Sequence, residues 1–239
     1  MINSSGRVSL YIRVKQQIKS KIESGEWETG SKIPGEFSLS QLLGVSRETL
    51  RKALNELERD GLVVRKPGDG TYVAIPRIDQ RLASFYSFSS EIRSMGLTPS
   101  TRVIDFTVIS ADPPLLFRLQ RPKSPFVYKI RRLRLANGIP FAVETSYVPC
   151  DLFPKLTKAV VDEFGLYSAM TKSANITPDS AQETFEAIIM SEIDAELLNC
   201  TPPAAALYLE RTTTSGDSVI EFCTSVVRGD MYKYHVLLQ

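Results

Sequence analysis

Apolar residues near the start of the chain recur every three or four positions, a spacing that predicts helices over residues 9–24, 35–43 and 46–60. The apolar stripe of the third helix consists of Leu50, Ala53, Leu54 and Leu57. Ser46 is a suitable N-cap for this helix, because a serine hydroxyl accepts hydrogen bonds from first-turn amides. Gly44 lies in the short turn before it, so the second and third helices together predict a helix-turn-helix.

Two short strand-like runs follow, over residues 62–66 and 71–74. They flank Pro67-Gly68-Asp69-Gly70, a sequence that favours a hairpin turn. Such a hairpin is typical of a wing, with Arg65 and Lys66 at its tip and two glycines whose amides can approach a phosphate. A plain surface hairpin and an ordinary amphipathic helix are the alternatives for these elements.

The pattern changes after Pro76, which breaks the wing strand. Strand-like runs cover residues 101–110, 126–136, 139–147, 206–214, 218–227 and 231–238. Helical patterns cover residues 82–95, 113–119, 162–172 and 191–198. Hairpin turns dominate, so we expect an α+β chain whose second part is a mainly antiparallel sheet with helices on one side. The expected domains are residues 1–75 and 82–239, joined by a linker over 76–81.

Composition narrows the function only a little. The chain has 239 residues, of which 43% are hydrophobic and 23% charged, as in an ordinary globular protein. Its net charge is +2, so any affinity for nucleic acid must come from local placement of basic side chains. No apolar run approaches the roughly 18 residues of a membrane span, and we expect no membrane partner.

Thiols and imidazole are sparse. The three cysteines are Cys150, Cys200 and Cys223, and the one histidine is His235. Their spacing fits neither a metal site nor a disulfide framework, so we expect no metal, no cofactor and a reducing, cytoplasmic location. His235 lies in an apolar run and is expected to be structural.

The predicted strand over residues 126–136 contains a second set of candidate functional residues. At period two, the face that carries Phe126, Tyr128 and Ile130 continues with Arg132 and Arg134. Two inward-facing arginines are costly unless an anion or carboxylates meet them. They either bind an anionic ligand or pair internally with acids such as Glu144 or Glu221.

The register of the following hairpin decides between two arrangements. A strict two-residue Asn137-Gly138 turn places Phe141 opposite Arg134 and sends Glu144 to the other face. A three-residue loop with a bulge places Glu144 opposite Arg132 instead. The sequence leaves both arrangements open.

Residues 9–74 resemble the winged helix-turn-helix of the GntR family of bacterial transcription regulators. The matching positions are Leu10-Tyr11, Ser24-Gly25-Glu26-Trp27, Gly30, Ile33-Pro34, Glu36, Gly44-Val45-Ser46-Arg47, Thr49, Arg51, Ala53-Leu54, Leu57, Gly61-Leu62 and Gly68-x-Gly70-Thr71-Tyr72-Val73. With the basic wing tip, the resemblance implies DNA contacts from Glu36, Ser46, Arg47, Thr49, Arg51, Lys66, Gly68 and Gly70.

This first region also departs from the family pattern. Phe37 stands where an arginine is usual, Gly35 where serine is common, and Glu48 where a small polar residue is usual. One basic contact fewer and one carboxylate more should weaken phosphate attraction and alter base preference. The general function therefore carries over better than the operator sequence does.

Residues 82–238 resemble the effector-binding UTRA domain of the HutC subfamily of GntR regulators, whose fold is similar to chorismate lyase. The matching pieces are Phe88-Ser89, Met95-Gly96-Leu97-Thr98-Pro99-Ser100-Thr101, Arg132-Leu133-Arg134, Ile139-Pro140, Glu144, Leu166-Tyr167, Glu221 and Arg228-Gly229-Asp230-x-Tyr232. The resemblance implies an effector site made of Phe88, Ser89, Arg132, Arg134, Glu144, Tyr167, Glu221 and Arg228. The sequence departs from the family pattern at two positions that concern the ligand. Gly165 stands where a phosphate-binding serine is frequent in the family, and Val227 stands where a tyrosine is frequent.

Together the two resemblances imply a sequence-specific transcription regulator, usually a repressor in this subfamily. Its effector would be a small anion, a sugar phosphate or related acidic metabolite, and a homodimer would read a palindromic operator in double-stranded DNA. The alternative is a lyase-like enzyme that carries a DNA-addressing domain. Fold resemblance alone is weak support for activity, and the arginines and glutamates lack a poised base, so we expect no enzyme. An architectural DNA binder is disfavoured by the large second domain.

Overall fold

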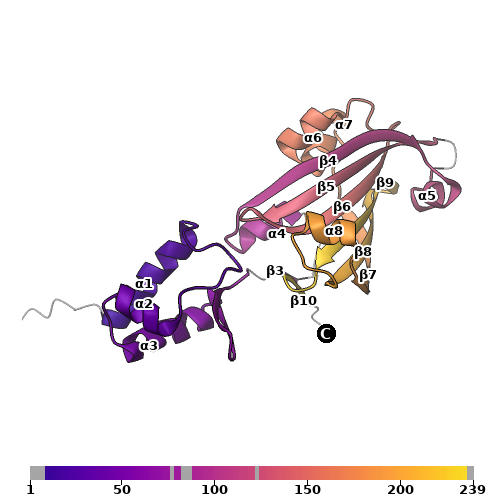
Figure 1. Cartoon of the computed structure of the whole chain (residues 1–239). Helices are drawn as coiled ribbons and strands as arrows, with labels where there is room; N and C mark the ends of the chain where they lie inside the picture. Colours follow the sequence, from indigo (N-terminus) through magenta and orange to yellow (C-terminus); the bar gives the residue numbers. More distant parts are fainter. Residues whose placement is uncertain (1–8, 76–77, 82–87, 122–123, 236–239) are drawn as a thin grey trace, which may run out of the picture. The chain divides into compact units, whose positions relative to one another are not determined.

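The computed structural model describes residues 9–75, 78–81, 88–121 and 124–235. The chain forms two compact units, residues 1–76 and residues 77–239. Helices and a short hairpin make up the first unit, and a broad twisted sheet with flanking helices makes up the second (Figure 1). The winged helix-turn-helix followed by a mainly antiparallel sheet is the architecture that the sequence predicts.

The first unit is built around the helix-turn-helix. Its elements are α1 Leu10–Glu23, α2 Glu36–Leu42, α3 Arg47–Arg59, β1 Val63–Lys66 and β2 Gly70–Val73. The predicted apolar stripes of α1 and α3 are buried against each other and against α2 and the wing, in a core made of Val14, Ile18, Ile33, Leu39, Leu50, Ala53, Leu54, Leu57, Val63 and Val73. The helical spacing of these apolar positions is therefore what fixes the packing.

The wing is tied to the segment before α2. Strands β1 and β2 pair antiparallel from Val63↔Val73 to Lys66↔Gly70. Lys32 forms an additional bridge with Tyr72, and the amide of Ile33 donates to the carbonyl of Thr71. This third stretch of extended chain holds the hairpin against the helical core.

The second unit contains the elements β3 Ile78–Arg81, α4 Phe88–Ser94, β4 Pro99–Ser110, α5 Pro113–Arg118, β5 Phe126–Ala136, β6 Ile139–Pro149, α6 Lys158–Phe164, α7 Leu166–Ala174, β7 Ser180–Ile189, α8 Glu192–Leu197, β8 Ala205–Ser215, β9 Ser218–Arg228 and β10 Tyr232–His235. Six strands form one sheet in the order β4-β5-β6-β9-β8-β7, and every neighbouring pair is antiparallel. Strands β3 and β10 form a separate parallel pair.

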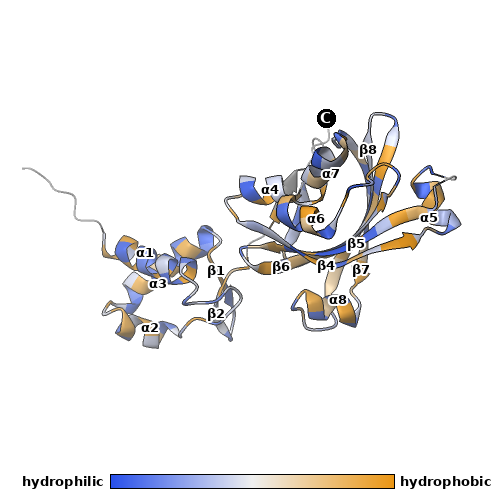
Figure 2. Cartoon of the chain, turned by 90° about the horizontal axis from the view of Figure 1, so that it is seen from above, coloured by the Kyte–Doolittle hydropathy of each residue, from blue (hydrophilic) through white to orange (hydrophobic). Residues whose placement is uncertain are grey.

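Helices cover both faces of the large sheet, whereas we expected them on one side. Figure 2 shows α4, α6 and α7 over one face and α8 on the other. Ile130 of β5 belongs to the core under α6 and α7, whereas Leu133 belongs to the core under α8. Because neighbouring strand residues point to opposite faces, Arg132 and Arg134 share the face of Ile130.

Three elements differ from the sequence-based expectation. Strand β3 lies in the stretch 76–81 that we expected to be a linker, where buried Ile78 is the only apolar residue of the strand. Strand β7 was not predicted, because its exposed edge position leaves no alternating apolar pattern. One expected helix over residues 162–172 is two helices, α6 and α7, divided at Gly165.

Other predicted bounds agree to within a few residues. The helix expected over residues 82–95 is described only from Phe88 to Ser94, and residues 82–87 lie outside the described part of the chain. The last strand is described over Tyr232–His235, and residues 236–239 lie outside it. His235 is exposed rather than buried.

Candidate effector cavity and DNA-binding surface

A cavity of about 200 Å³ lies on the face of the sheet that also carries α4 and α7. Seven of the eight residues predicted for an effector site line it, namely Phe88, Ser89, Arg132, Arg134, Glu144, Tyr167 and Glu221. Strands β5, β6, β8 and β9 supply its floor, and α4 and the α6–α7 junction supply its walls. With Glu183 of β7, residues from eight separate elements are thus brought to one place.

The hairpin register takes the bulged form of the two alternatives. Arg132 lies opposite Glu144, Arg134 lies opposite Ala142, and the register shifts between Arg134 and Leu135. The extra residue of the bulge returns Glu144 to the arginine face. A strict two-residue register would have put this carboxylate on the α8 side of the sheet.

Arg132 is held by two carboxylates and a hydroxyl. Its Nη2 lies 3.0 Å from Glu144 Oε2 and 3.8 Å from Glu221 Oε1, and it donates to Ser146 Oγ over 2.7 Å. Burial alone would lower the pKa of Arg132, but the charges of Glu144 and Glu221 outweigh it, so the net pKa is raised. Internal pairing with acids, one of the two sequence-based alternatives, is therefore present.

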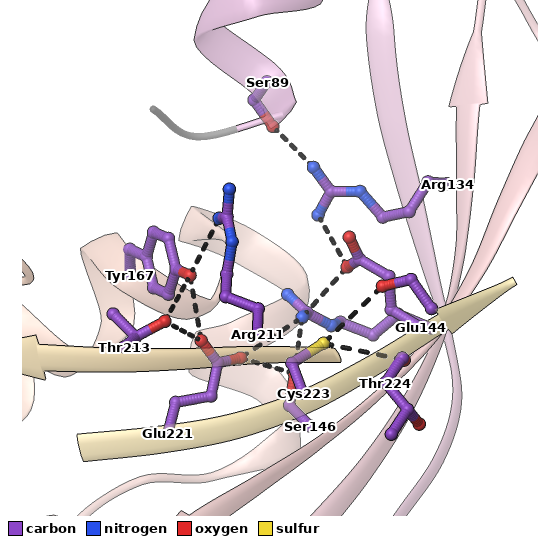
Figure 3. Close-up of polar contacts among 12 residues, drawn as sticks. Ser89, Arg134, Glu144, Ser146, Tyr167, Arg211, Thr213, Glu221, Cys223 and Thr224 are labelled. Atoms are coloured by element: carbon purple, nitrogen blue, oxygen red, sulfur yellow. Dashed lines mark hydrogen bonds and ion pairs between the residues drawn. The ribbon is translucent and has the colours of Figure 1, made fainter. Parts of the chain in front are cut away.

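Glu221 is the centre of a hydrogen-bonded network (Figure 3). Its Oε2 accepts from Tyr167 Oη over 2.8 Å and from Thr213 Oγ1 over 3.1 Å. Its Oε1 accepts from Ser146 Oγ over 2.6 Å. Burial, reinforced by the charge of Glu221, raises the pKa of Tyr167 well above its ordinary value, so the phenol remains a donor.

Arg134 faces the α4 side of the cavity. Its Nη2 donates to Ser89 Oγ over 3.2 Å, and its guanidinium lies 5.6 Å from the centre of the Phe88 ring. The nearest carboxylate oxygen is Glu144 Oε2, 3.7 Å from Arg134 Nη1. This is the same oxygen that pairs with Arg132, so two buried guanidinium groups share it.

The cavity is also lined by a second arginine–glutamate pair, Arg211 and Glu183, which was not predicted from the sequence. Arg211 Nε donates to Glu183 Oε1 over 2.6 Å, and Arg211 Nη1 lies 3.4 Å from Tyr167 Oη. Arg211 shares the buried face of β8 with Leu209 and Thr213, and this period of two was a usable signal. Glu183 belongs to the unpredicted strand β7, so the sequence offered no partner for Arg211.

Arg228, which was also expected in the effector site, does not line this cavity. It makes two hydrogen bonds to the carboxylate of Asp230, at 3.0 and 2.7 Å, and donates to the carbonyl of Leu198 over 3.1 Å. Its position at the end of β9 directs it to the chain segment after α8. The Arg-Gly-Asp match therefore marks a structural anchor.

The first turn of α3 has the predicted cap. Ser46 Oγ accepts from the amide of Thr49 over 3.2 Å. Arg47 is exposed, with its guanidinium 5.0 Å from the centre of the Phe37 ring. Arg51 is also exposed and its Nε donates to Glu36 Oε2 over 2.9 Å. Five predicted DNA-contact residues thus gather where α2 and α3 begin.

The wing presents a smaller basic surface than expected. Lys66 is exposed, with its Nζ 4.4 Å from the centre of the Tyr72 ring. Arg65, in contrast, turns back to α3 and donates to Asn55 Oδ1 over 2.6 Å. Gly68 and Gly70 both have positive φ, at 77° and 143°, as a tight turn requires. Lys32 pairs with Asp69 beside them.

Two further features concern metal binding and membrane insertion. No group of three or more histidine, cysteine, aspartate or glutamate side chains is arranged to hold a metal ion there. Among the helices that the structure describes, none combines the length and apolar character needed to cross a membrane.

Comparison with known protein families covers both units. Residues 10–73 match the model described as bacterial regulatory proteins, gntR family. Residues 94–233 match the UTRA domain. The two matches fall on the winged helix-turn-helix and on the part that contains the cavity.

Individual relatives agree with the family matches. The HTH-type transcriptional repressor NagR of Bacillus subtilis is 31% identical, over 98% of this chain and 96% of its own length. The mannosyl-D-glycerate transport/metabolism system repressor MngR of Escherichia coli is 27% identical, over 98% of both chains. The crystal structure of PhnF from Mycobacterium smegmatis shares the fold, with a TM-score of 0.67 at 24% identity over 95% of this chain and 99% of that one.

These families and relatives are transcription regulators, so the lyase-like enzyme alternative is not supported. The chain belongs to the gntR family of bacterial regulatory proteins, as a HutC-type transcription regulator with a UTRA domain.

Proposed function

We propose that this protein is a transcriptional repressor whose operator affinity is controlled by a small anion, a phosphorylated or otherwise acidic sugar, bound in the cavity of the second unit. It binds a palindromic operator as a homodimer through α3 and the wing. The effector favours a conformation in which the two recognition helices no longer match the half-sites.

The observation that carries the effector proposal is the sharing of Glu144 by two arginines. Arg132 and Arg134 are each less than one-tenth exposed, and both contact Glu144 Oε2. Within the described part of the chain, the buried Nε of Arg132 has no hydrogen-bond partner. A phosphate or carboxylate placed between Arg134 and Ser89 would add the negative charge and acceptors that this arrangement favours.

The other end of the cavity contains hydrogen-bond acceptors that could bind the hydroxyl groups of a sugar. Glu221, Glu183 and Tyr167 line that wall, and carboxylate oxygens accept from sugar hydroxyls. The lining residues that the structure describes include four arginines against three glutamates, which favours an anionic over a neutral ligand. The name of MngR refers to mannosyl-D-glycerate, a sugar that carries an acid, and this agrees with the same ligand class.

A route from effector to DNA passes through α4. Ser89 of α4 contacts Arg134 of β5, so an anion bound by both would fix α4 against the sheet. In the described part of the chain, α4 is the first helix after the DNA-binding unit. An effector that binds better to one position of α4 therefore shifts the population of DNA-binding conformations.

The test combines a ligand screen with DNA binding by the full-length protein. Phosphorylated hexoses, amino sugars and sugar acids are screened by thermal shift, because a ligand of the native state raises the melting temperature. Arg134→Gln should reduce the shift strongly, because it weakens binding of the ligand. Arg131→Gln is the matched control, since Arg131 lies on the same strand but pairs with Asp194 outside the cavity.

Compounds that raise the melting temperature are then added to the protein on DNA from upstream of its own gene. We expect them to weaken the complex for the wild type and Arg131→Gln and to leave Arg134→Gln on the DNA. No sequence-specific binding at low salt overturns the DNA half of the proposal. Ligands that bind equally well to Arg134→Gln overturn the effector half. Light scattering that shows a monomer on and off DNA overturns the homodimer.

A further inference from the structure

One large aromatic side chain in the first unit is not used by the core. Phe37 lies in the first turn of α2 and is 56% exposed. The buried residues of this helix are Leu39 and Ser40, and Leu39 belongs to the core cluster, whereas Phe37 does not. An aromatic ring on the surface next to a predicted recognition helix is a candidate contact residue.

The ring of Phe37 is in contact with a base-reading candidate. The Arg47 guanidinium lies 5.0 Å from the ring centre, a cation–π distance. No carboxylate among the described residues pairs with Arg47, so its donors are not occupied by an acid. The neighbour of Phe37, Glu36, binds Arg51 on the next turn of α3. Phe37, Arg47 and Arg51 therefore occupy one continuous surface.

The chemistry of the major groove selects a partner for this surface. Arginine reads guanine by two hydrogen bonds to O6 and N7. In the major groove, thymine presents an apolar C5-methyl group, and a phenylalanine ring can pack against this methyl group. An aromatic ring stacked on an arginine suits a thymine next to a guanine.

We propose that Phe37 is a base-reading residue, which packs against the methyl group of a thymine adjacent to the guanine that Arg47 contacts. The proposal rests on DNA binding through α3. The arginine that is usual at this position in the family would add attraction to phosphate. Phe37 instead adds a preference for one base.

The first experiment selects binding sites from random-sequence DNA with full-length protein. We expect the wild type to enrich one thymine in each half-site beside an enriched guanine. Phe37→Ala should lose the thymine and keep the other positions. Leu42→Ala is the matched control, because Leu42 is an exposed apolar residue of the same helix, at 66% exposure, and it should leave every preference unchanged.

The second experiment replaces that thymine by deoxyuridine, which removes only the methyl group. Wild-type affinity should fall about fourfold per half-site, as expected for one lost methyl contact. Phe37→Ala should bind the two sites equally. A wild-type protein that does not distinguish deoxyuridine from thymidine overturns the proposal, as does a Phe37→Ala protein that still does.

The possible outcomes distinguish failure of the Phe37 proposal from failure of the DNA-binding proposal. If the wild type enriches no sequence, base reading by α3 is wrong and Phe37 with it. If it enriches a site without a methyl requirement, only the Phe37 proposal fails. Should Phe37→Ala lose the guanine while it keeps the thymine, the ring only orients Arg47, and the thymine contact is overturned.

Discussion

Arg132 of β5 and Glu144 of β6 face each other across two neighbouring strands, with Nη2 of the arginine 3.0 Å from Oε2 of the glutamate. Both side chains are almost completely buried. A buried ion pair gives little net stability when intact, since desolvation offsets most of the attraction. Loss of one partner, however, leaves an uncompensated charge in the interior.

Glu144→Gln should therefore lower the free energy of unfolding by about 3 kcal/mol, because two arginines lose their shared carboxylate. Urea unfolding of the full chain measures the effect. Asp151→Asn is the control, since it removes the exposed partner of Arg121 and should cost no more than about 1 kcal/mol. Added phosphate should recover part of the loss in Glu144→Gln. Equal effects of the two substitutions would contradict the role given to Glu144.

Arg228 and Arg134 should give opposite phenotypes. Arg228→Gln removes bonds to Asp230 and to the carbonyl of Leu198, so the melting temperature should fall while effector affinity stays within about twofold. Arg134→Gln should weaken binding of the effector roughly ten- to hundredfold, the value of a charged hydrogen bond. Calorimetric titration at a temperature where both variants are folded makes the comparison. A loss of affinity in Arg228→Gln alone would return that residue to the effector site.

The wing and the recognition helix should differ in their salt dependence. Lys66→Ala removes one phosphate contact, so it should weaken binding to all sequences and reduce the slope of log K against log salt by about 0.9. Arg47→Ala should mainly relax base preference. Fluorescence anisotropy across a salt series, on operator and unrelated DNA, separates them. Arg59→Ala, at the far end of α3, should change neither quantity. Identical behaviour of Lys66→Ala and Arg47→Ala would show that the assignment is wrong.

The thiol of Cys223 should make stability pH-dependent in alkali. Burial, reinforced by Glu221 and Glu144, raises its pKa from 9.0 to about 12. The folded protein therefore keeps a proton that the unfolded chain loses, so the contribution is complete below pH 9 and is lost as the pH rises toward 12.

Above pH 9, the wild-type free energy of unfolding should fall more steeply than that of Cys223→Ser, by up to about 1.4 kcal/mol per pH unit. Urea unfolding at pH 8, 9 and 10 of both proteins measures the difference. Every other ionisable group is shared by the pair, so parallel curves would mean that Cys223 is not buried as described.

Much of the first unit could be predicted from the sequence, because its elements are local. The stripe of Leu50, Leu54 and Leu57 and the Ser46 cap are read within one helix, and both are found in the structure. Phe37 was recognised as a departure, but its contact with Arg47 depends on how two helices pack. Tertiary packing of that kind leaves no signature in the spacing of either helix.

The cavity was predicted in part, and the failures have identifiable causes. Glu144 was predicted for the cavity, but the sequence left its face open, because neither hairpin turn residue specifies the bulge of one residue. Glu183 lies in an edge strand whose exposed side chains hide the period of two, so its pairing with Arg211 was invisible. Arg228 was assigned from a family match alone, and its short bonds to Asp230 show a structural role.

Gly165, which divides α6 from α7 beside the cavity, has φ 77° and ψ 161°. This is a backbone conformation that glycine adopts readily and that other residues adopt only at a cost of about 1–3 kcal/mol. Space beside its Cα is open, so the barrier to a side chain is conformational rather than steric. A serine at this position would bear that cost unless the chain followed a different path at the helix junction. Exchange of glycine for serine beside the cavity therefore carries a conformational cost in this chain, in addition to any effect on the ligand.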